Sequence, residues 1–345
     1  MNNGVSIIIC CYNSSKLLPE TIKYICSQKI SENIKWEVIV IDNNSFDNTS
    51  RIAEKLLNEY KCPAIYKIFS QPDQGLSFAR KMGLDNSQYE YILFCDDDNW
   101  LDERYIETGF LLLESNKDIG ALGGHSEAVI EGDFPEWFLN NKQNYSIGKQ
   151  SAESGDITWS EGVLWGAGMF VRTSALRELY SDGFKSLLTD RKGNELSSGG
   201  DSELCYALRL AGWKIWYDER LLLKHFITKE RLNWNYLRKL NRGFGAQKVD
   251  FDPYLKIDEK PTGFKQKWQY QVIKLIGKLR GYGLKKLLKF NKTIEGDAEI
   301  LRIEKSLGRL RELFKIRGEY NKRIISVRNA KWRKVFPRKI YISDC

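Results

Sequence analysis

The hydrophobic positions in the first hundred residues form short apolar runs that alternate with stretches of helical spacing. The runs have the length of buried strands, and the stretches between them place apolar side chains on one helical face. We expect strands over residues 5–11, 36–41, 64–69 and 91–95, and helices over residues 16–28, 47–60 and 76–84. Because strands and helices alternate, the pattern predicts an α/β fold with a mostly parallel sheet flanked by helices on both faces.

The pattern is looser beyond residue 100. Residues 131–165 are rich in Gly, Asn, Ser and aromatic residues, which predicts long loops with Trp137, Trp159 and Trp165 partly exposed. After these loops we expect strands over residues 166–171, 214–217 and 221–224, and helices over residues 173–180 and 201–211. The elements continue the α/β pattern and show no internal repeat.

Charge divides the chain near residue 250. Residues 1–250 hold 29 Lys and Arg against 35 Asp and Glu, whereas residues 251–345 hold 25 against 10, so the net charge of +9 comes entirely from the C-terminal part. This basic part has helical spacing, with Trp268, Val272 and Leu275 on one face. It fits either an amphipathic appendage that packs on the body or a helix that lies on an anionic membrane surface.

The composition is that of an ordinary globular protein, with 42% hydrophobic and 29% charged residues in a chain of 345. Its seven cysteines have neither the spacing of a disulfide framework nor that of a zinc site. The N-terminus shows no secretory-signal pattern, and no apolar stretch approaches the roughly 20 residues that span a bilayer. We therefore expect a cytoplasmic protein, either soluble or peripherally bound to the inner face of the cytoplasmic membrane.

Three carboxylates, Asp96, Asp97 and Asp98, directly follow the apolar run at residues 91–95. Ligands of an open α/β sheet bind beyond the carboxyl ends of its strands, where Asp42 also ends a predicted strand. Because neighbouring carboxylates repel one another, a bound divalent cation is the simplest way to neutralise them. The alternative is a polar turn after the strand.

Other segments join the Asp triplet in a recognisable order. They are residues 6–13 (SIIICCYN), 38–49 (VIVIDNNSFDNT), 165–172 (WGAGMFVR), 199–204 (GGDSEL) and His225. Together they resemble the family 2 inverting glycosyltransferases with the GT-A fold over about two thirds of the chain. Each segment alone is a weak signal, but the ordered set is specific.

The resemblance implies a division of the chain into a catalytic domain and an appendage. A GT-A (Rossmann-like) domain is expected at residues 1–250, with a nucleotide-binding half at 1–100 and an acceptor and catalytic half at 101–250. A basic, mainly helical C-terminal region follows at residues 251–345.

The donor side of the implied site falls on four residues of the first half. Asp42 matches the residue that hydrogen-bonds the nucleotide base in the family, since a carboxylate accepts from a ring N–H. Tyr12 and Asn13, at the end of the first motif, are further donor-binding candidates, and Arg80 matches a cation that meets the diphosphate. The alternatives are an Asp that caps its own turn at position 42 and an ordinary exposed helix Arg at position 80.

The resemblance assigns the outer carboxylates of the triplet to a metal-bound donor. Asp98 matches the ligand of a divalent metal, and Asp96 the residue that contacts the ribose or the water shell of the metal. Asp97, between them, is grouped with the donor-binding residues, although its side chain is expected to point elsewhere. His225 resembles an additional metal ligand of part of the family; a structural hydrogen-bonding role is the alternative. Carboxylate ligands suit Mn²⁺ or Mg²⁺, and an imidazole favours Mn²⁺.

Asp201 matches the catalytic base, which takes the proton of the acceptor hydroxyl as that hydroxyl attacks the anomeric carbon. The same residue could cap the helix that follows it, and the two roles are compatible. The chain departs from the family pattern at two positions. Gly200 replaces an acidic residue before the base, which puts any second-carboxylate role in doubt, and Cys10 replaces a Pro at the end of the first strand.

These residues predict a metal-dependent, hexosyl-type inverting glycosyltransferase that uses a nucleoside diphosphate-sugar, most simply a UDP-sugar. The expected acceptor is a hydroxyl of a glycan or lipid-linked saccharide in surface polysaccharide biosynthesis, and Trp159, Trp165 and Trp213 are either acceptor contacts or core residues. One alternative is a sugar nucleotidyltransferase, against which stands the absence of a Gly-rich loop after the first strand. The other is a non-catalytic protein that binds membrane or nucleic acid through the basic tail; of the two partners, we expect the membrane and no nucleic acid.

Overall fold

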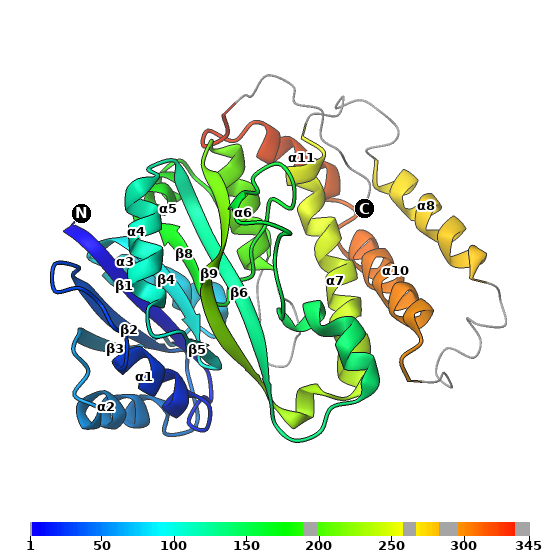
Figure 1. Ribbon diagram of the computed structural model, residues 1–345. Coiled ribbons are helices and arrows are strands. Elements are labelled where there is room, and N and C mark those ends of the chain that lie inside the picture. The colour runs from blue at the N-terminus through cyan, green and yellow to red at the C-terminus, as the bar shows by residue number, and fades with distance from the viewer. Residues whose placement is uncertain (1, 189–198, 258–266, 283–294, 335–345) are drawn as a thin grey trace.

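The computed structural model describes residues 2–188, 199–257, 267–282 and 295–334. Its sheet begins with the four parallel strands that the sequence predicts, β1 (Asn2–Cys11), β2 (Trp36–Asp42), β3 (Ile65–Ser70) and β4 (Tyr89–Asp96). They lie in the order β3-β2-β1-β4, with β1 and β4 in register so that Cys10 pairs with Asp96. The carboxyl ends of β1, β2 and β4 therefore lie at one edge of the sheet (Figure 1).

The other half of the sheet is mixed. Beyond β4 follow β8 (Met169–Arg172), β6 (Ile119–Ile130), β9 (Lys214–Ile227) and β5 (Asn99–Leu101), and β7 (Gly155–Asp156) also pairs with β9. β8 is antiparallel to both β4 and β6, whereas β6 and β9 are parallel. The α/β fold class with a mostly parallel sheet is thus confirmed for the first half, and antiparallel pairs complete it.

The sequence did not predict β6, because β6 contains glycines and glycine is depleted in strands. Here they have a packing role. A Cβ at Gly124 would collide with the carbonyl oxygen of Leu221, so glycine allows β6 and β9 to approach at an irregularity in their register. Glycine at this position is therefore compatible with a strand that sequence statistics disfavour.

The prediction of two short strands at residues 214–217 and 221–224 was wrong. The residues between them, Asp218 to Arg220, are polar, but β9 continues through them as one strand of 14 residues. His225 consequently lies inside β9 rather than after a strand, and it pairs across the sheet with Asn99 of β5.

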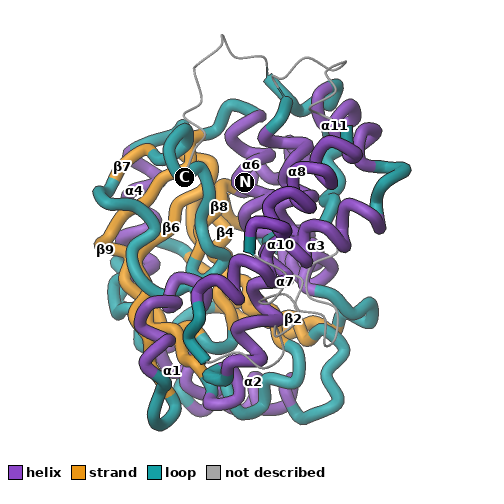
Figure 2. The backbone as a smooth tube through the Cα atoms, turned by 90° about the vertical axis from the view of Figure 1, so that its right-hand side faces the viewer, coloured by secondary structure: helices purple, strands orange, loops and turns teal. Residues whose placement is uncertain are grey.

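Helices cover both faces of the sheet (Figures 1 and 2). One face carries α1 (Leu18–Cys26), α2 (Thr49–Glu59) and α4 (Tyr105–Ser115), and the other carries α3 (Leu76–Asn86), α5 (Thr173–Ser181) and α6 (Gly200–Leu210). Successive residues of β1 point to opposite faces of the sheet. Ile7 and Ile9 belong to the core under α1, α2 and α4, and Ile8 belongs to the core under α3, α5 and α6. Each is fully buried, and such burial contributes about 1.5–3 kcal/mol per side chain.

The C-terminal part is helical and packs on the end of the sheet. It comprises η2 (Lys229–Arg231), α7 (Trp234–Leu255), α8 (Trp268–Gly281), α10 (Ala298–Lys315) and α11 (Tyr320–Arg328). α7 runs continuously through residue 250, where the sequence suggested a domain boundary, and α10 lies along it (Figure 1). The helical nature of the C-terminal region is confirmed, and α7 connects it to the catalytic half.

Trp137 corrects the expectation of an exposed loop. It lies in the 3₁₀ helix η1 (Glu136–Tyr145), is only 7% exposed and packs against Trp234 of α7. Trp159 and Trp165 are half-buried, as expected. None of the described helices combines the length and the hydropathy needed to cross a bilayer. The six cysteines among the described residues are free thiols.

Candidate functional site

A cavity of about 660 Å³ lies between the carboxyl ends of β1 and β4 and the helix α7. Seven of the nine candidate residues line it: Tyr12, Arg80, Asp96, Asp97, Asp98, Asp201 and His225. Asn13 and Asp42 do not, although Asn43, next to Asp42, does. Residues far apart in the sequence thus meet in one volume large enough for a nucleotide-sized ligand.

The Asp triplet is held by its own chain at the end of β4. The side chain of Asn99 accepts a hydrogen bond from the Asp96 N–H at 3.1 Å and donates to Asp98 Oδ1 at 3.0 Å. Asp97 accepts from the Ser14 hydroxyl, and its carbonyl accepts from Thr21 at 2.7 Å. The turn predicted as the alternative is therefore present, and it directs these carboxylates to the cavity.

Asp98 is the centre of a charged group formed by β9 and the turn after it. Its Oδ2 lies 3.3 Å from His225 Nε2 and 3.0 Å from Arg231 Nη1. The backbone N–H of Phe226 donates to the Asp98 carbonyl at 2.9 Å. Burial alone would lower the pKa of Arg231, but the charge of Asp98 and nearby tyrosines outweigh it, so this pKa is raised. Arg231 is therefore a permanent cation beside Asp98.

A divalent cation fits this group only together with other ligands. Asp98 Oδ2 and His225 Nε2 face each other and form an oxygen and nitrogen pair of the kind that Mn²⁺ accepts. Among the described residues no cluster of three or more His, Cys, Asp or Glu side chains could hold a metal alone. In the described part of the chain, His225 Nδ1 is buried without a hydrogen-bond partner, and the contact of Nε2 with Asp98 Oδ2 orients the ring. Phosphate oxygens and water would have to complete the coordination.

Asp201 and Arg80 meet on the opposite side of the cavity, against Gly166. The Gly166 N–H donates to Asp201 Oδ2 at 2.6 Å, and the Ser202 N–H donates to Oδ1 at 2.8 Å. A Cβ at Gly166 would lie 2.6 Å from Arg80 Nη2, so a side chain at this position would displace the Arg80 guanidinium. The N-cap of α6 is Gly199, and Asp201 lies in the first turn with its carboxylate facing the cavity.

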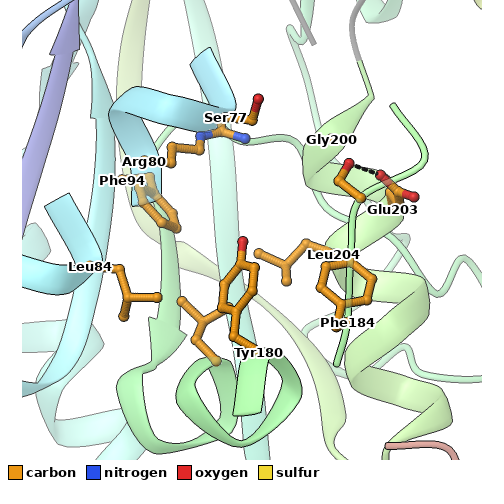
Figure 3. A pocket seen from close by; sticks show the side chains of 11 residues that line it. Ser77, Arg80, Leu84, Phe94, Tyr180, Phe184, Gly200, Glu203 and Leu204 are labelled. Atoms are coloured by element: carbon orange, nitrogen blue, oxygen red, sulfur yellow. Dashed lines mark hydrogen bonds between the residues drawn. The ribbon is translucent and has the colours of Figure 1, made fainter. Parts of the chain in front are cut away.

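Arg80 also borders a second, smaller cavity of about 50 Å³ behind it (Figure 3). Its guanidinium carbon lies 5.1 Å from the ring centroid of Phe94, an orientation that favours a cation–π contact. Across this small cavity Glu203 accepts hydrogen bonds from the Ser186 hydroxyl and the Leu187 N–H. Packing between the two cavities therefore restrains the orientation of Arg80.

Asp42 and Asn13 hold together two loops at the edge of the main cavity. Asp42 accepts from the Ser45 N–H at 3.0 Å and from the Ser50 hydroxyl, the capping arrangement that the sequence left as an alternative. Asn13 Oδ1 accepts from the Phe46 N–H at 2.8 Å. Tyr12 and Phe46 form an edge-to-face pair, and Phe46 is 82% exposed. This pair presents an exposed aromatic surface beside the cavity.

Sequence reasoning missed the wall that faces the carboxylates. It is formed by α7, η1 and the turn before α7, and its residues are Gln143, Asn144, Tyr145, Ser146, Thr228, Arg231, Tyr236, Leu240, Phe244 and Gln247. Their helical spacing in α7 was visible in the sequence, but it could not be told from a core face. Of the three tryptophans considered, Trp165 lines the cavity, whereas Trp159 lies over Arg209 and Trp213 over Arg172.

Comparison with known families agrees with the motifs. The model of the family "Glycosyl transferase family 2" matches residues 6–180, about half of the chain, and this range holds the Asp triplet and Arg80. The protein therefore belongs to glycosyltransferase family 2 and is a glycosyltransferase with a GT-A-like fold. Membership of this family argues against the sugar nucleotidyltransferase alternative.

Named relatives are similar over part of their length. Cholesterol galactosyltransferase of Borreliella burgdorferi is 39% identical over 103 residues, 30% of this chain and 27% of the relative. Chondroitin synthase of Escherichia coli is 25% identical over 191 residues, 51% of this chain and 26% of the relative. The chain thus spans about a quarter of the length of these two relatives.

Solved structures support the fold. TarS 1–349 of S. aureus superposes with a TM-score of 0.51 and 16% identity, covering 92% of this chain and 91% of that one. GalNAc-T7, solved with UDP, GalNAc and Mn²⁺, has a TM-score of 0.51 at 14% identity, with 74% of this chain and 53% of that one covered. At these identities the similarity establishes the fold alone.

Proposed function

We propose that the protein is a metal-dependent inverting glycosyltransferase that transfers a sugar from a UDP-sugar to a hydroxyl of a glycan or lipid-linked saccharide. The observation that carries this proposal is that Asp201, Arg80 and the Asp98–His225 pair line one cavity. A base, a fixed cation and a pair of metal-type ligands are the groups that inverting transfer requires. Surface polysaccharide or glycolipid synthesis is the proposed setting, since the relatives include a cholesterol galactosyltransferase and a chondroitin synthase.

In this proposal the donor lies along the ends of β1, β2 and β4. The uracil ring stacks beside Tyr12 and Phe46, whose exposed rings offer an aromatic surface. Asn13 and Asp42 shape the loop that meets the base, and Asp42 accepts from it. UDP and UDP-GlcNAc are bound by TarS, which shares the fold, and this supports a UDP-sugar donor.

The chemical step is assigned to Asp201. The acceptor hydroxyl gives its proton to the Asp201 carboxylate while its oxygen bonds to the anomeric carbon, and the bond from that carbon to the diphosphate oxygen breaks on the opposite side. Two N–H donors hold the carboxylate in one orientation before the acceptor arrives. Arg80 attracts the negative charge that gathers on the departing diphosphate.

Asp98 and His225 would hold the divalent cation, with Asp96 toward the ribose and Asp97 kept in place by Ser14. Bound there, Mn²⁺ or Mg²⁺ would neutralise the diphosphate as it leaves. Arg231 already contributes a positive charge at the same carboxylate. The anionic donor is therefore met by positive charge from the protein itself.

Isothermal titration tests this proposal most directly. UDP, GDP and dTDP are titrated with and without Mn²⁺ into the intact protein and into Asp98→Ala. We expect Mn²⁺-dependent binding of UDP that the variant loses. Binding that is unchanged by Mn²⁺ and by the substitution would contradict the metal assignment, and no binding of any nucleotide would contradict the donor site.

A further inference from the structure

Two side chains contact one oxygen at the metal side of the cavity. Asp98 Oδ2 lies 3.3 Å from His225 Nε2 and 3.0 Å from Arg231 Nη1. The other carboxylate oxygen, Oδ1, accepts a hydrogen bond from Asn99 at 3.0 Å. A divalent cation held by Asp98 and His225 would therefore share Oδ2 with the guanidinium of Arg231. Because an arginine side chain is not deprotonated in proteins, the two positive charges would repel each other at this oxygen.

The backbone of Arg231 is held on both sides of the residue. Its N–H donates to the Thr228 carbonyl at 3.0 Å, and its own carbonyl accepts from the Tyr145 hydroxyl at 3.1 Å. The Lys229 N–H of the same 3₁₀ turn donates to Glu131 at 3.0 Å. These contacts leave the long side chain, rather than the backbone, as the part of Arg231 that can change partner.

The guanidinium of Arg231 lines the cavity with donor capacity to spare. Its side chain is 18% exposed, and its Nε is buried without a hydrogen-bond partner in the part of the chain that the structure describes. A guanidinium carries five N–H donors in one plane, and this planar fork matches two oxygens of a phosphate. A diphosphate in the cavity would therefore offer Arg231 acceptors for donors that these surroundings leave unused.

A diphosphate would also supply what a divalent cation needs at this place. Asp98 and His225 offer one oxygen and one nitrogen, and Mn²⁺ or Mg²⁺ requires further oxygen ligands. Phosphate oxygens can complete this coordination and accept from Arg231 at the same time. The negative charge that they bring offsets the repulsion between the two cations.

We propose that Arg231 competes with the divalent cation for Asp98 Oδ2, and that the donor diphosphate ends this competition by drawing the guanidinium to its own oxygens. The inference rests on the proposed function, since it takes Asp98 and His225 as the metal side of the donor site. Arg231 then keeps the metal affinity of the free protein low and couples metal binding to donor binding. If the ion pair only oriented Asp98, its removal would have the opposite effect and weaken metal binding.

Mn²⁺ binding without nucleotide tests the competition. The electron paramagnetic resonance signal of free Mn²⁺ is followed as the metal is added to the full chain and to Arg231→Gln, Arg231→Lys and Arg220→Gln. Arg220 is the matched control, because it pairs with Asp218 of β9 at 2.8 Å and does not line the cavity. We expect Arg231→Gln to bind Mn²⁺ about tenfold or more tightly than the wild-type chain. Arg231→Lys, which keeps the charge, should lie closer to the wild type, and Arg220→Gln should equal it.

Isothermal titration of UDP in the presence of Mn²⁺ tests the transfer of Arg231 to the diphosphate. Arg231→Gln should bind UDP about tenfold or more weakly, because it loses a charged hydrogen bond to the phosphates. The substitution thus changes the two affinities in opposite directions, tighter for the metal alone and weaker for the nucleotide. A loss of folding would weaken both, and circular dichroism of each variant checks the fold.

Two results would overturn the inference. Mn²⁺ binding by Arg231→Gln that equals or falls below that of the wild-type chain would remove the competition for Asp98. Unchanged UDP affinity in this variant would remove the contact between Arg231 and the diphosphate. Both results leave the proposed function in place as long as the wild-type chain binds UDP with Mn²⁺, whereas a wild-type chain without Mn²⁺-dependent UDP binding would contradict the proposed function itself.

Discussion

At the scale of single residues, the candidate site depends on side chains that the backbone holds in place. Asp201 accepts from two N–H groups, Asp98 is fixed by Asn99 and Phe226, and Gly166 leaves room for Arg80. Such contacts reduce the reorganisation that a reacting group needs. A conservative substitution of one of these residues should therefore change the reaction rate without changing ligand affinity, or the reverse.

Asp201→Asn should lower kcat by about 10²–10⁴-fold, because an amide keeps the shape of the side chain but cannot take the acceptor proton. The Asn carbonyl can still accept from the Gly166 N–H, so the fold and UDP affinity should stay unchanged. Product formation and UDP titration measure the two effects. A variant that retains the wild-type rate would remove Asp201 from the role of base.

Cys62 offers a pH-dependent reaction outside the site. A hydrogen bond from the Cys26 thiol lowers the pKa of Cys62 to about 7, whereas burial raises that of Cys11 and Cys95. Because the thiolate is the nucleophile, the alkylation rate of Cys62 should rise with pH and reach half its maximum near pH 7.

Iodoacetamide labelling followed by mass spectrometry, over a pH series, measures that rate. Cys26→Ser serves as the control and should keep part of the effect, since a hydroxyl also donates to sulfur. A midpoint near the ordinary thiol value of about 8.5 would show that the thiol pair does not form in solution.

At the scale of elements, the packing of α7 on α10 depends on glycine. Gly308 lies against the backbone of α7, whereas a Cβ at Gly277 of α8 would meet nothing within 4 Å. The two positions are therefore a matched pair: both are helical glycines, and only one is at a helix crossing.

Gly308→Ala should lower the free energy of unfolding by about 1–3 kcal/mol, because the methyl group must separate two touching helices. Gly277→Ala should raise it by up to about 1 kcal/mol through helix propensity. Equilibrium unfolding in urea measures both changes. Equal effects of the two substitutions would mean that the helices can separate without cost.

At the scale of the whole molecule, the cavity joins the sheet to the C-terminal helices, so a ligand that bridges them stabilises the fold. The site residues come from β4, α3, α6 and β9, and the facing wall comes from α7. A ligand that binds only the folded state raises the free energy of unfolding by RT ln(1 + c/Kd), where c is the concentration of free ligand.

UDP with Mn²⁺ at a hundredfold excess over Kd should add about 2.7 kcal/mol, which corresponds to a rise in Tm of several degrees. UDP with EDTA should give a smaller rise, since the diphosphate then lacks one counter-charge. Differential scanning calorimetry measures both, with Asp98→Ala as the control. An equal rise with Mn²⁺ and with EDTA would contradict the proposed metal dependence.

The fold of the first hundred residues could be predicted because their pattern is local. The apolar runs of β1, β2 and β4 are buried on both faces, so periodicity alone identifies them. β6 and the full length of β9 could not be predicted, since their glycines and charged residues are compatible with strands only where the two strands meet. The prediction that Trp137 is partly exposed was wrong for the same reason, because its burial depends on Trp234, far along the chain.

The sequence by itself determined the class of the protein, the position of the Asp triplet and the basic character of the C-terminal part. These properties depend on residue order and on strand ends, which are local. Only the tertiary structure decided that His225 and Arg231 lie against Asp98, that Gly166 lies against both Asp201 and Arg80, and that α7 forms the facing wall. Such contacts join residues more than thirty positions apart, and no local pattern encodes the distance between them.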